Sequence, residues 1–414
     1  MEGTPHRIVC YGCSLLCDDV FIELDSDGKI IRTVNSCFRG NEVIRTVDND
    51  RRILQPTKKQ MGLTMKVDMD EGINVFKENL QKAETITVYG LGAISYEDQI
   101  SVLELIQILQ SKGRKITLGD CSNFIQISAK IGLPLTSVGQ AINNGDVFVF
   151  WKTDPTHSHP KLTGKLVFSR GYFRSTGKEV KKFALIEPEE SDLTDLKDVL
   201  INDSEMSEQE LVSNVKKLVE ADGADIVNFP GIDKVDLKEL KKYTEATEYG
   251  VLVTTIPFDK NKAEEHLQHV KQLLDILNKS TKGRFMLLPL MLTSNEIGLS
   301  NAVLSMFTRD EINEMLTDSE ETSDLALIFG GEYLHDEYAV REFVYEEESR
   351  ILFDNLPSSV SKRATITIPF KLPGIEVKDV AVRLDQIGVE LNKFMDSPEQ
   401  MLSITEIMNR VKKS

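Results

Sequence analysis

The sequence contains no apolar run long enough to cross a membrane. Its longest run, residues 285–292, is interrupted by Pro289 and is much shorter than the roughly 20 residues that a transmembrane helix needs. The N-terminus also lacks a basic stretch followed by an apolar segment, so no export signal is predicted. We therefore expect a cytoplasmic protein without membrane insertion.

Basic residues are outnumbered by acidic ones. Lysine and arginine together number 49, aspartate and glutamate number 66, and the formal net charge is −17. A surface of this sign repels phosphate groups, which argues against nucleic acid or an anionic membrane as the main partner. The hydrophobic content of 41% is ordinary for a soluble protein, and the length of 414 residues predicts more than one compact domain.

Cysteine is rare and unevenly distributed. The chain has five cysteines, which are not expected to form disulfides in a protein without an export signal. Four of them lie close together in the sequence, namely Cys10, Cys13, Cys17 and Cys37. Thiolates gathered in this way are typical ligands of zinc or of an iron–sulfur cluster.

The spacing of these cysteines favours iron–sulfur. Structural zinc sites usually combine two Cys-x2-Cys pairs. Here Cys10 and Cys13 form such a pair, while Cys17 and Cys37 stand alone. A Cys-x2-Cys-x3-Cys triplet with a distant fourth cysteine can instead bind the corners of a four-iron cluster. We predict a [4Fe–4S] cluster, with a zinc site and unliganded structural thiols as the alternatives.

Short apolar strands alternate with amphipathic helices along most of the chain. Residues 20–24 and 29–34 predict a hairpin joined by the turn sequence Asp-Ser-Asp-Gly. Further strands are predicted at residues 85–89, 115–118, 147–151, 183–186, 225–229, 251–255, 284–288 and 325–329. Helices are predicted at residues 96–110, 208–219 and 263–277. This alternation predicts an α/β fold with doubly wound parallel sheets in more than one domain.

Polar residues or glycines follow several of the predicted strands. They are Gly90 and Gly92, residues 154–160, residues 187–191, and Gly330 with Gly331. Ligands of doubly wound sheets bind beyond the carboxyl ends of the strands, so these loops are candidate binding segments. The Gly-x-Gly sequence at residues 90–92 is not a dinucleotide fingerprint, because the rest of that motif is absent.

The cysteine motif and two later segments resemble one protein family. Residues 9–19 read Val-Cys-Tyr-Gly-Cys-Ser-Leu-Leu-Cys-Asp-Asp, which is similar to the N-terminal cluster motif in the B subunit of formylmethanofuran dehydrogenase, a molybdopterin oxidoreductase. Residues 151–160 and 169–173 resemble the stretch beside the pterin in that family. Cys121 falls where the family places a metal-ligating cysteine.

The resemblance implies an oxidoreductase that reduces carbon dioxide to formate at a tungsten or molybdenum centre held by bis-(molybdopterin guanine dinucleotide). Electrons would reach this centre through the [4Fe–4S] cluster, and formate would be passed on to make formylmethanofuran. The implied partners are a barrel-type D subunit, an amidohydrolase-like A subunit, a C subunit and ferredoxin-like electron carriers. The implied fold is formate dehydrogenase/DMSO reductase-like, with domains I–III and without the C-terminal barrel.

The resemblance also implies domain limits and residue roles. A cluster domain would span residues 1–60, a pterin-binding α/β domain residues 61–180, and a second α/β domain residues 181–320, before residues 321–414 return to the first α/β domain. Cys121 would ligate the metal, and His159 would handle a proton beside it. The implied cofactor-binding residues are Asp154, Ser158, Gly90, Gly92, Gly330 and Gly331.

Some residues depart from the family pattern. Ser-Asn-Phe at residues 122–124 replaces the usual His-Gly-Pro after the ligating cysteine, and Glu187 and Glu189 belong to a Glu-Pro-Glu run in place of Asp-Pro-Arg. Carboxylates repel the phosphates that an arginine would bind. The alternatives are therefore a non-catalytic paralogue that serves as an electron relay or scaffold, and another molybdopterin oxidoreductase. His266 and His269 are predicted to lie on a solvated helix face.

Overall fold

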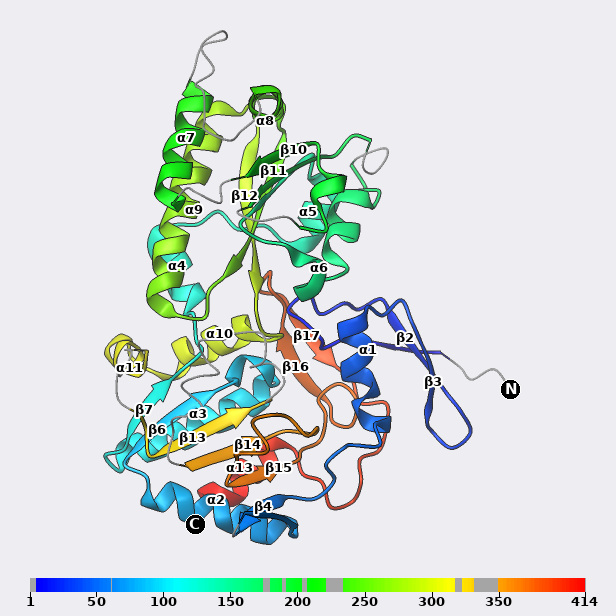
Figure 1. The fold of residues 1–414 in the computed structure, drawn as a ribbon, viewed down its shortest axis with the longest axis vertical. Coiled ribbons are helices and arrows are strands. Elements are labelled where there is room, and N and C mark those ends of the chain that lie inside the picture. Colours follow the sequence, from blue (N-terminus) through cyan, green and yellow to red (C-terminus); the bar gives the residue numbers. More distant parts are fainter. Residues whose placement is uncertain are drawn as a thin grey trace. The chain divides into compact units, whose positions relative to one another are not determined.

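The computed structural model describes residues 5–60, 62–173, 179–187, 191–202, 207–220, 234–316, 322–330 and 349–413. The chain divides into two compact units. The first unit comprises residues 1–122, 293–383 and 387–414, and the second comprises residues 123–292 and 384–386. Each unit is built around its own sheet (Figure 1). No helix in the described ranges is long and apolar enough to cross a membrane.

The first unit begins with a small antiparallel sheet. Its elements are β1 (His6–Ile8), β2 (Val20–Leu24), β3 (Ile30–Val34), α1 (Phe38–Arg45) and the 3-10 turn η1 (Thr46–Asp48). The predicted hairpin is β2–β3, and its turn is closed by the carboxylate of Asp25, which accepts from the backbone N–H groups of Asp27 and Lys29. Gly28 has a φ of +78°, which glycine adopts without steric cost.

A seven-stranded sheet forms the core of the first unit, in the order β5-β4-β15-β14-β13-β6-β7. Its strands are β4 (Thr57–Gln60), β5 (Leu63–Lys66), β6 (Thr85–Tyr89), β7 (Lys115–Leu118), β13 (Leu325–Phe329), β14 (Ser349–Phe353) and β15 (Ile366–Ile368). The strands from β15 to β7 are parallel, and the hairpin β4–β5 is added antiparallel at one edge.

Helices and a second hairpin complete the first unit. They are α2 (Met69–Lys82), η2 (Leu91–Ala93), α3 (Tyr96–Ser111), α10 (Glu296–Met306), α11 (Arg309–Met315), α13 (Ile404–Lys412), β16 (Asp379–Val382) and β17 (Gly388–Leu391). Strand β13 is buried along its whole length, as expected of a central parallel strand. The rings of Phe329 and Phe353 stack 4.7 Å apart, and α3 and α13 contribute further apolar residues to the same core.

The second unit contains a parallel five-stranded sheet in the order β10-β9-β8-β11-β12. Its strands are β8 (Val147–Trp151), β9 (Lys182–Glu187), β10 (Val199–Asn202), β11 (Tyr249–Ile256) and β12 (Arg284–Met291). Its helices are α4 (Phe124–Ile131), α5 (Val138–Asn144), α6 (Pro155–Ser158), η3 (Gly164–Phe168), η4 (Thr194–Leu196), α7 (Glu208–Glu220), α8 (Lys234–Ala246) and α9 (Lys260–Ser280). In Figure 1, α7 and α9 lie side by side.

The strand order of the second sheet reverses between β8 and β11. Strands β8, β9 and β10 follow one another in one direction, and β11 and β12 then continue on the other side of β8. Doubly wound sheets bind ligands at such a switch point, beyond the carboxyl ends of the strands. Thr153, just after β8, and Thr255 in β11 meet there through their hydroxyl oxygens, 2.6 Å apart.

The structure confirms the predicted α/β class, and the described predicted strands and helices coincide with observed elements to within a few residues. The predicted strand 225–229 lies outside the described residues. The chain passes from the first unit to the second after residue 122 and returns to the first after residue 292, whereas the predicted α/β domains ended at residues 180 and 320. The difference arises because β8, predicted to belong to the first α/β domain, pairs with β9 and β11 of the second sheet.

Candidate cluster and metal sites

Three of the clustered cysteines lie in one tight loop of the first unit. The loop is closed by the backbone N–H of Cys10, which donates to the carbonyl of Cys17 at 2.8 Å. Within it, the N–H of Leu16 donates to the carbonyl of Cys13, and Leu16 adopts a φ of +40°. Cys10, Cys13 and Cys17 are all buried, so the loop directs its thiols inward rather than into solvent.

The fourth cysteine faces this loop from the start of α1. Cys37 is the N-cap of that helix, and its sulfur accepts from the backbone N–H of Gly40 at 3.5 Å. A Cβ added to Gly40 would lie 2.6 Å from the sulfur of Cys10 and 3.8 Å from the sulfur of Cys37. Glycine at this position therefore lets the two sulfurs approach the same stretch of backbone.

The four thiols also interact electrostatically. Burial raises the pKa of the Cys13 thiol well above its usual range, and Cys17, Cys10 and Cys37 raise it further. Four neighbouring thiolates need a positive group among them to remain ionised. Within the described residues, no three His, Cys, Asp or Glu side chains are arranged to hold one metal ion. In a four-iron cluster each thiolate binds a different iron, and three thiols from the closed loop with one from the start of α1 are the ligands predicted for it.

Cys121 lies at the carboxyl-end edge of the seven-stranded sheet. It follows β7 after Gly119 and Asp120, and it is buried among the core residues of the first unit. The carboxylate of Asp120 accepts from the backbone N–H of Gly90, which follows the neighbouring strand β6. The loops after two adjacent strands are thereby joined directly beside the candidate metal ligand.

Glu296 anchors the residue next to Cys121. One of its oxygens accepts from both the backbone N–H of Ser122 at 3.0 Å and the Ser122 hydroxyl at 2.8 Å, and the other accepts from Thr293 at 3.1 Å. Glu296 is the first residue of α10, where the helix dipole favours a negative charge. The sequence gives no local signal for this contact, because Ser122 lies 174 positions away in the chain.

The two acidic residues beside Cys121 affect each other. Burial and the nearby Glu296 raise the pKa of Asp120, and burial raises the pKa of Glu296. Asp120 accepts from the backbone N–H of Gly90, whereas Glu296 receives three hydrogen bonds that suit a carboxylate. Asp120 is therefore the better candidate for the neutral form. Burial thus disfavours the charged form of both groups, and the three hydrogen bonds that Glu296 accepts offset part of this effect.

The glycines that follow the strands of this sheet approach the chain itself. A Cβ on Gly90 would lie 1.9 Å from the carbonyl oxygen of Phe329, and one on Gly92 would lie 2.1 Å from the hydroxyl of Thr293. Gly330 donates its N–H to Phe353 with a φ of +76°. Close packing of the loops is therefore sufficient to explain why glycine occupies these positions. Cofactor binding by these glycines stays a prediction.

The predicted histidine site lies in the second unit, at the switch point of its sheet. Asp154 caps α6 by accepting from the backbone N–H and the hydroxyl of Thr156. His159 follows α6, is buried, and has its Nδ1 3.0 Å from the hydroxyl of Ser158. Asp154, Ser158 and His159 are thus brought together, whereas Cys121 and the predicted glycines belong to the first unit.

Some predicted residues are outside the described part of the chain. Gly331 and Glu189 fall in undescribed segments, and the side chain of Glu187 is also not described. Their expected roles stay predictions.

The prediction for His266 was wrong. Its side chain is buried between α7, α9 and β11, with Nε2 3.0 Å from the hydroxyl of Thr254 and Nδ1 2.9 Å from Glu208. His269 contacts the other oxygen of Glu208 at 3.0 Å. These hydrogen bonds, led by those of His266, lower the pKa of Glu208 despite its partial burial. The charged face of α9 can pack against α7 because Glu208 forms the hydrogen bonds with His266 and His269 that water would form with them on an exposed face.

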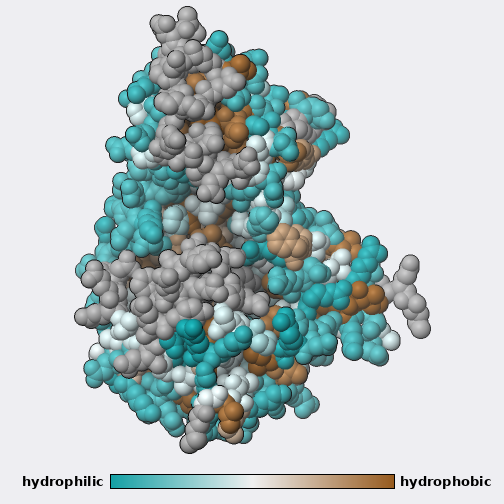
Figure 2. Space-filling model, in the orientation of Figure 1, coloured by the Kyte–Doolittle hydropathy of each residue, from teal (hydrophilic) through white to brown (hydrophobic). Residues whose placement is uncertain are grey.

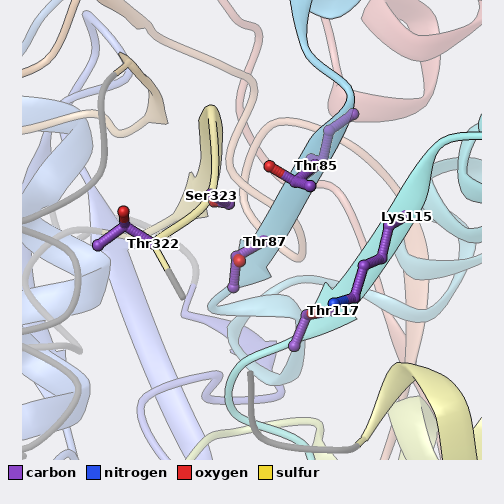
Figure 3. Close-up of a pocket in the computed structure, with 7 residues that line it drawn as sticks. Thr85, Thr87, Lys115, Thr117, Thr322 and Ser323 are labelled. Atoms are coloured by element: carbon purple, nitrogen blue, oxygen red, sulfur yellow. The ribbon is translucent and has the colours of Figure 1, made fainter. Parts of the chain in front are cut away.

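Two hollows lie away from these candidate sites. A cavity of about 350 Å³ lies beside Glu208, His266 and His269 in the second unit. A second hollow, of about 20 Å³, is lined by Thr85, Thr87 and Lys115 and is shown in Figure 3. It lies at the amino ends of β6 and β7, opposite the edge that carries Cys121, and has room for little more than a water molecule.

The fold is shared with two structures of known enzymes. A chain of the formyltransferase/hydrolase complex FhcABCD from Methylorubrum extorquens, solved with methylofuran, has a TM-score of 0.58 and 14% sequence identity, and the match covers 86% of this chain and 98% of that one. Acetylene hydratase from Pelobacter acetylenicus also has a TM-score of 0.58, with 11% identity over 98% of this chain and 68% of its own. At these identities the likeness defines the class of α/β fold alone.

The sequence comparisons identify the resemblance more closely. No protein-family model matches the chain. It is 24% identical, over 99% of its length and 98% of the relative, to the B subunit of tungsten-containing formylmethanofuran dehydrogenase 2 of Methanocaldococcus jannaschii. The protein of the same name from Methanococcus maripaludis is also 24% identical, over 97% of this chain and 96% of the relative. The resemblance to the B subunit of formylmethanofuran dehydrogenase is therefore confirmed over nearly the full chain.

Proposed function

We propose that the chain is the B-type component of a formylmethanofuran dehydrogenase complex, reducing carbon dioxide to formate that is then used to make formylmethanofuran. The observation that carries the proposal is the nearly end-to-end similarity to two proteins of that name. The arrangement of the cysteine loop supports it independently, because it brings together the four thiols of the cluster motif.

In this proposal the four thiols hold a [4Fe–4S] cluster that delivers electrons. Cys10, Cys13 and Cys17 would bind three irons from the closed loop, and Cys37 would bind the fourth from the start of α1. The N–H of Gly40 points to the sulfur of Cys37, and hydrogen bonds to ligating sulfurs help to set the reduction potential of a cluster. Anaerobically purified protein should contain about four irons per chain and show brown charge-transfer absorption.

Cys121 would ligate tungsten or molybdenum, which bis-(molybdopterin guanine dinucleotide) would hold. A soft thiolate suits a metal already bound by sulfur. When bound, this centre would supply the two-electron chemistry, and the protein would supply binding, orientation and electron delivery. His159, which is buried with Ser158 beside its Nδ1, would handle the proton that formate formation requires.

A second candidate function is that of an electron relay or scaffold without its own catalysis. The observation that favours it is the pair Asp120 and Glu296 beside Cys121. A buried carboxylate disfavours a cofactor that carries phosphates, and one repulsion near a protein surface amounts to a few kcal/mol. Burial raises the pKa of both carboxyl groups, and any charge that either of them keeps would repel the phosphates. The relay or scaffold function therefore predicts iron without tungsten or molybdenum.

Metal analysis combined with one substitution separates the two functions. The native complex would be purified without oxygen, and its iron, tungsten and molybdenum would be measured together with viologen-linked formate oxidation. The catalytic function predicts one tungsten or molybdenum per chain, and loss of both metal and activity in Cys121→Ala with iron retained. Iron without tungsten or molybdenum, unchanged in Cys121→Ala, would instead establish the relay or scaffold.

The proposal extends to the partners of the complex. We expect the barrel-type D subunit, the amidohydrolase-like A subunit, the C subunit and ferredoxin-like carriers to copurify with the chain. The likeness to a chain of a complex with several subunits supports this expectation. A stable association of this kind buries more than roughly 1,200 Å². Recovery of the chain from its host as a lone monomer under gentle conditions would count against the complex.

A further inference from the structure

The edge strand β5 is exposed along its whole length. All four of its residues are accessible to solvent, and within the described residues it pairs with β4 alone. The side chains of Leu63 and Met65 are 69% and 49% exposed, so this one short strand presents two large apolar side chains to solvent. An open edge offers unpaired backbone groups to any further strand.

The hairpin β4–β5 has two chemically different faces. Leu63 and Met65 alternate with Thr64 and Lys66, so the apolar pair lies on one face and Lys66 on the other. The register places Lys59 of β4 opposite Thr64, which puts Lys59 on the same face as Lys66. One face therefore carries both apolar side chains of β5, opposite Gln60 and Lys58 of β4, and the other face carries Lys59 and Lys66.

The positive charge of this hairpin is not balanced within it. Residues 57–66 include three lysines and no acidic residue, in a protein whose formal net charge is −17. Lys58 forms an ion pair with Glu71 at 3.4 Å. The ammonium of Lys59 instead donates to the backbone carbonyl of Lys362, and an uncharged carbonyl does not neutralise its positive charge. In the view of Figure 2, hydrophilic residues cover much of the coloured surface, and hydrophobic residues appear on it in separate patches.

The lysines decide which strand this edge can accept. Pairing with β5 of a second copy would bring two cationic hairpins together, and like charges across a strand pair are destabilising. Lysine on an edge strand commonly prevents self-association in this way. An acidic strand meets no such repulsion. Nucleic acid is disfavoured because residues 57–66 contain no aromatic side chain on which a base could stack.

We propose that β5 is an interaction surface that accepts an extended segment of an acidic partner polypeptide as an additional strand. The partner's apolar side chains would lie on the face of Leu63 and Met65, and its carboxylates on the face of Lys59 and Lys66. The inference does not depend on the cluster or on the proposed redox function, because every residue that carries it lies in this hairpin.

The test uses the full chain and a short labelled peptide in which valine and glutamate alternate, as the two faces require. A peptide in which lysine replaces glutamate serves as the reference. We expect the acidic peptide to bind at least about tenfold more tightly, with an affinity that falls as salt is added. Hydrogen exchange of the backbone amides of residues 63–66 should slow when the acidic peptide is bound.

Two double variants make the test specific. Lys59→Glu with Lys66→Glu should reverse the preference between the two peptides, whereas Lys279→Glu with Lys282→Glu, on exposed residues of the second unit, should leave it unchanged. Equal affinity of wild type for both peptides would overturn the proposal. Absence of acidic-peptide binding to wild type would also overturn it. Protection of residues 63–66 by an oligothymidine but not by the peptide would also overturn it.

Discussion

Ser122 donates two hydrogen bonds to a single oxygen of Glu296, one from its backbone N–H at 3.0 Å and one from its hydroxyl at 2.8 Å. The two residues are 174 positions apart in the chain. Because Ser122 directly follows Cys121, this double hydrogen bond fixes the backbone on which the proposed metal ligand is carried.

The first prediction concerns this anchor. Glu296→Ala would leave the N–H and hydroxyl of Ser122 and the hydroxyl of Thr293 without a buried acceptor, which should lower the free energy of unfolding by about 3 kcal/mol or more. Glu296→Gln keeps an acceptor oxygen of the same shape and should cost much less. Urea unfolding of both variants provides the measurement, and equal destabilisation by alanine and glutamine would show that the hydrogen bonds do not matter.

The second prediction concerns the glycine against the cluster thiols. In Gly40→Ala the new methyl group would lie 2.6 Å from the sulfur of Cys10 and 2.8 Å from the hydroxyl of Ser36, so the loop and α1 must move apart. We expect the anaerobic protein to lose most of its iron and its brown absorption. Gly139→Ala is the matched control, because only the hydroxyl of Ser137, 4.0 Å away, lies near its added Cβ. Full iron content in Gly40→Ala would contradict the proposed cradle.

Local sequence patterns predicted the elements of the fold well. The expected helix 96–110 is α3, Tyr96–Ser111, because apolar residues of helical period mark it within the chain. The expected strand 325–329 coincides with β13, because a short, wholly apolar run suits a buried parallel strand. The clustered cysteines could also be recognised from their spacing alone, and the cluster that they are expected to bind stays a prediction.

Contacts between distant residues were not predictable from one sequence. Strand β8 belongs to the second sheet because it pairs with β11, which begins about a hundred residues later in the chain. Local sequence patterns do not predict a pairing over such a distance. His266 was expected in solvent because its helix face is charged, and only the approach of α7 places Glu208 against it. Glu296 binds the loop after β7 through Ser122, and no pattern among the neighbouring residues in the sequence predicts this contact.

The third prediction concerns a buried lysine in the second unit. The ammonium of Lys181, whose side chain is fully buried, donates to the carbonyls of Ile142, Leu166 and Ser169. Lys181→Met would fill the space but leave three carbonyls without a donor, which should cost about 3 kcal/mol or more. The neighbouring Lys182→Met, at a half-exposed side chain, should change stability little. Thermal unfolding measures both, and similar melting temperatures for the two variants would contradict the inferred role.

The last prediction concerns a pair of buried carboxyl groups bridged by one hydroxyl. The hydroxyl of Ser95 lies 2.9 Å from an oxygen of Asp98 and 2.7 Å from an oxygen of Asp379. A hydroxyl has one proton to donate, so the second short contact is favourable only when one of the carboxyl groups carries a proton. Burial, followed by repulsion from Asp379, raises the pKa of Asp98 from 3.8 to about 6.

This pKa makes stability depend on pH in a definite direction. Between pH 3.8 and about 6 the folded protein binds more protons at Asp98 than the unfolded chain does, so the free energy of unfolding falls as the pH rises through this range. Asp98→Asn keeps an acceptor for Thr405 and offers a donor to Ser95 at every pH. The variant should therefore be more stable than wild type above pH 7, by up to about 3 kcal/mol, and the advantage should vanish toward pH 4. Urea unfolding across this range, with the exposed Asp50→Asn as the control, measures the difference, and a difference that does not change with pH would show that Asp98 remains ionised in the folded protein.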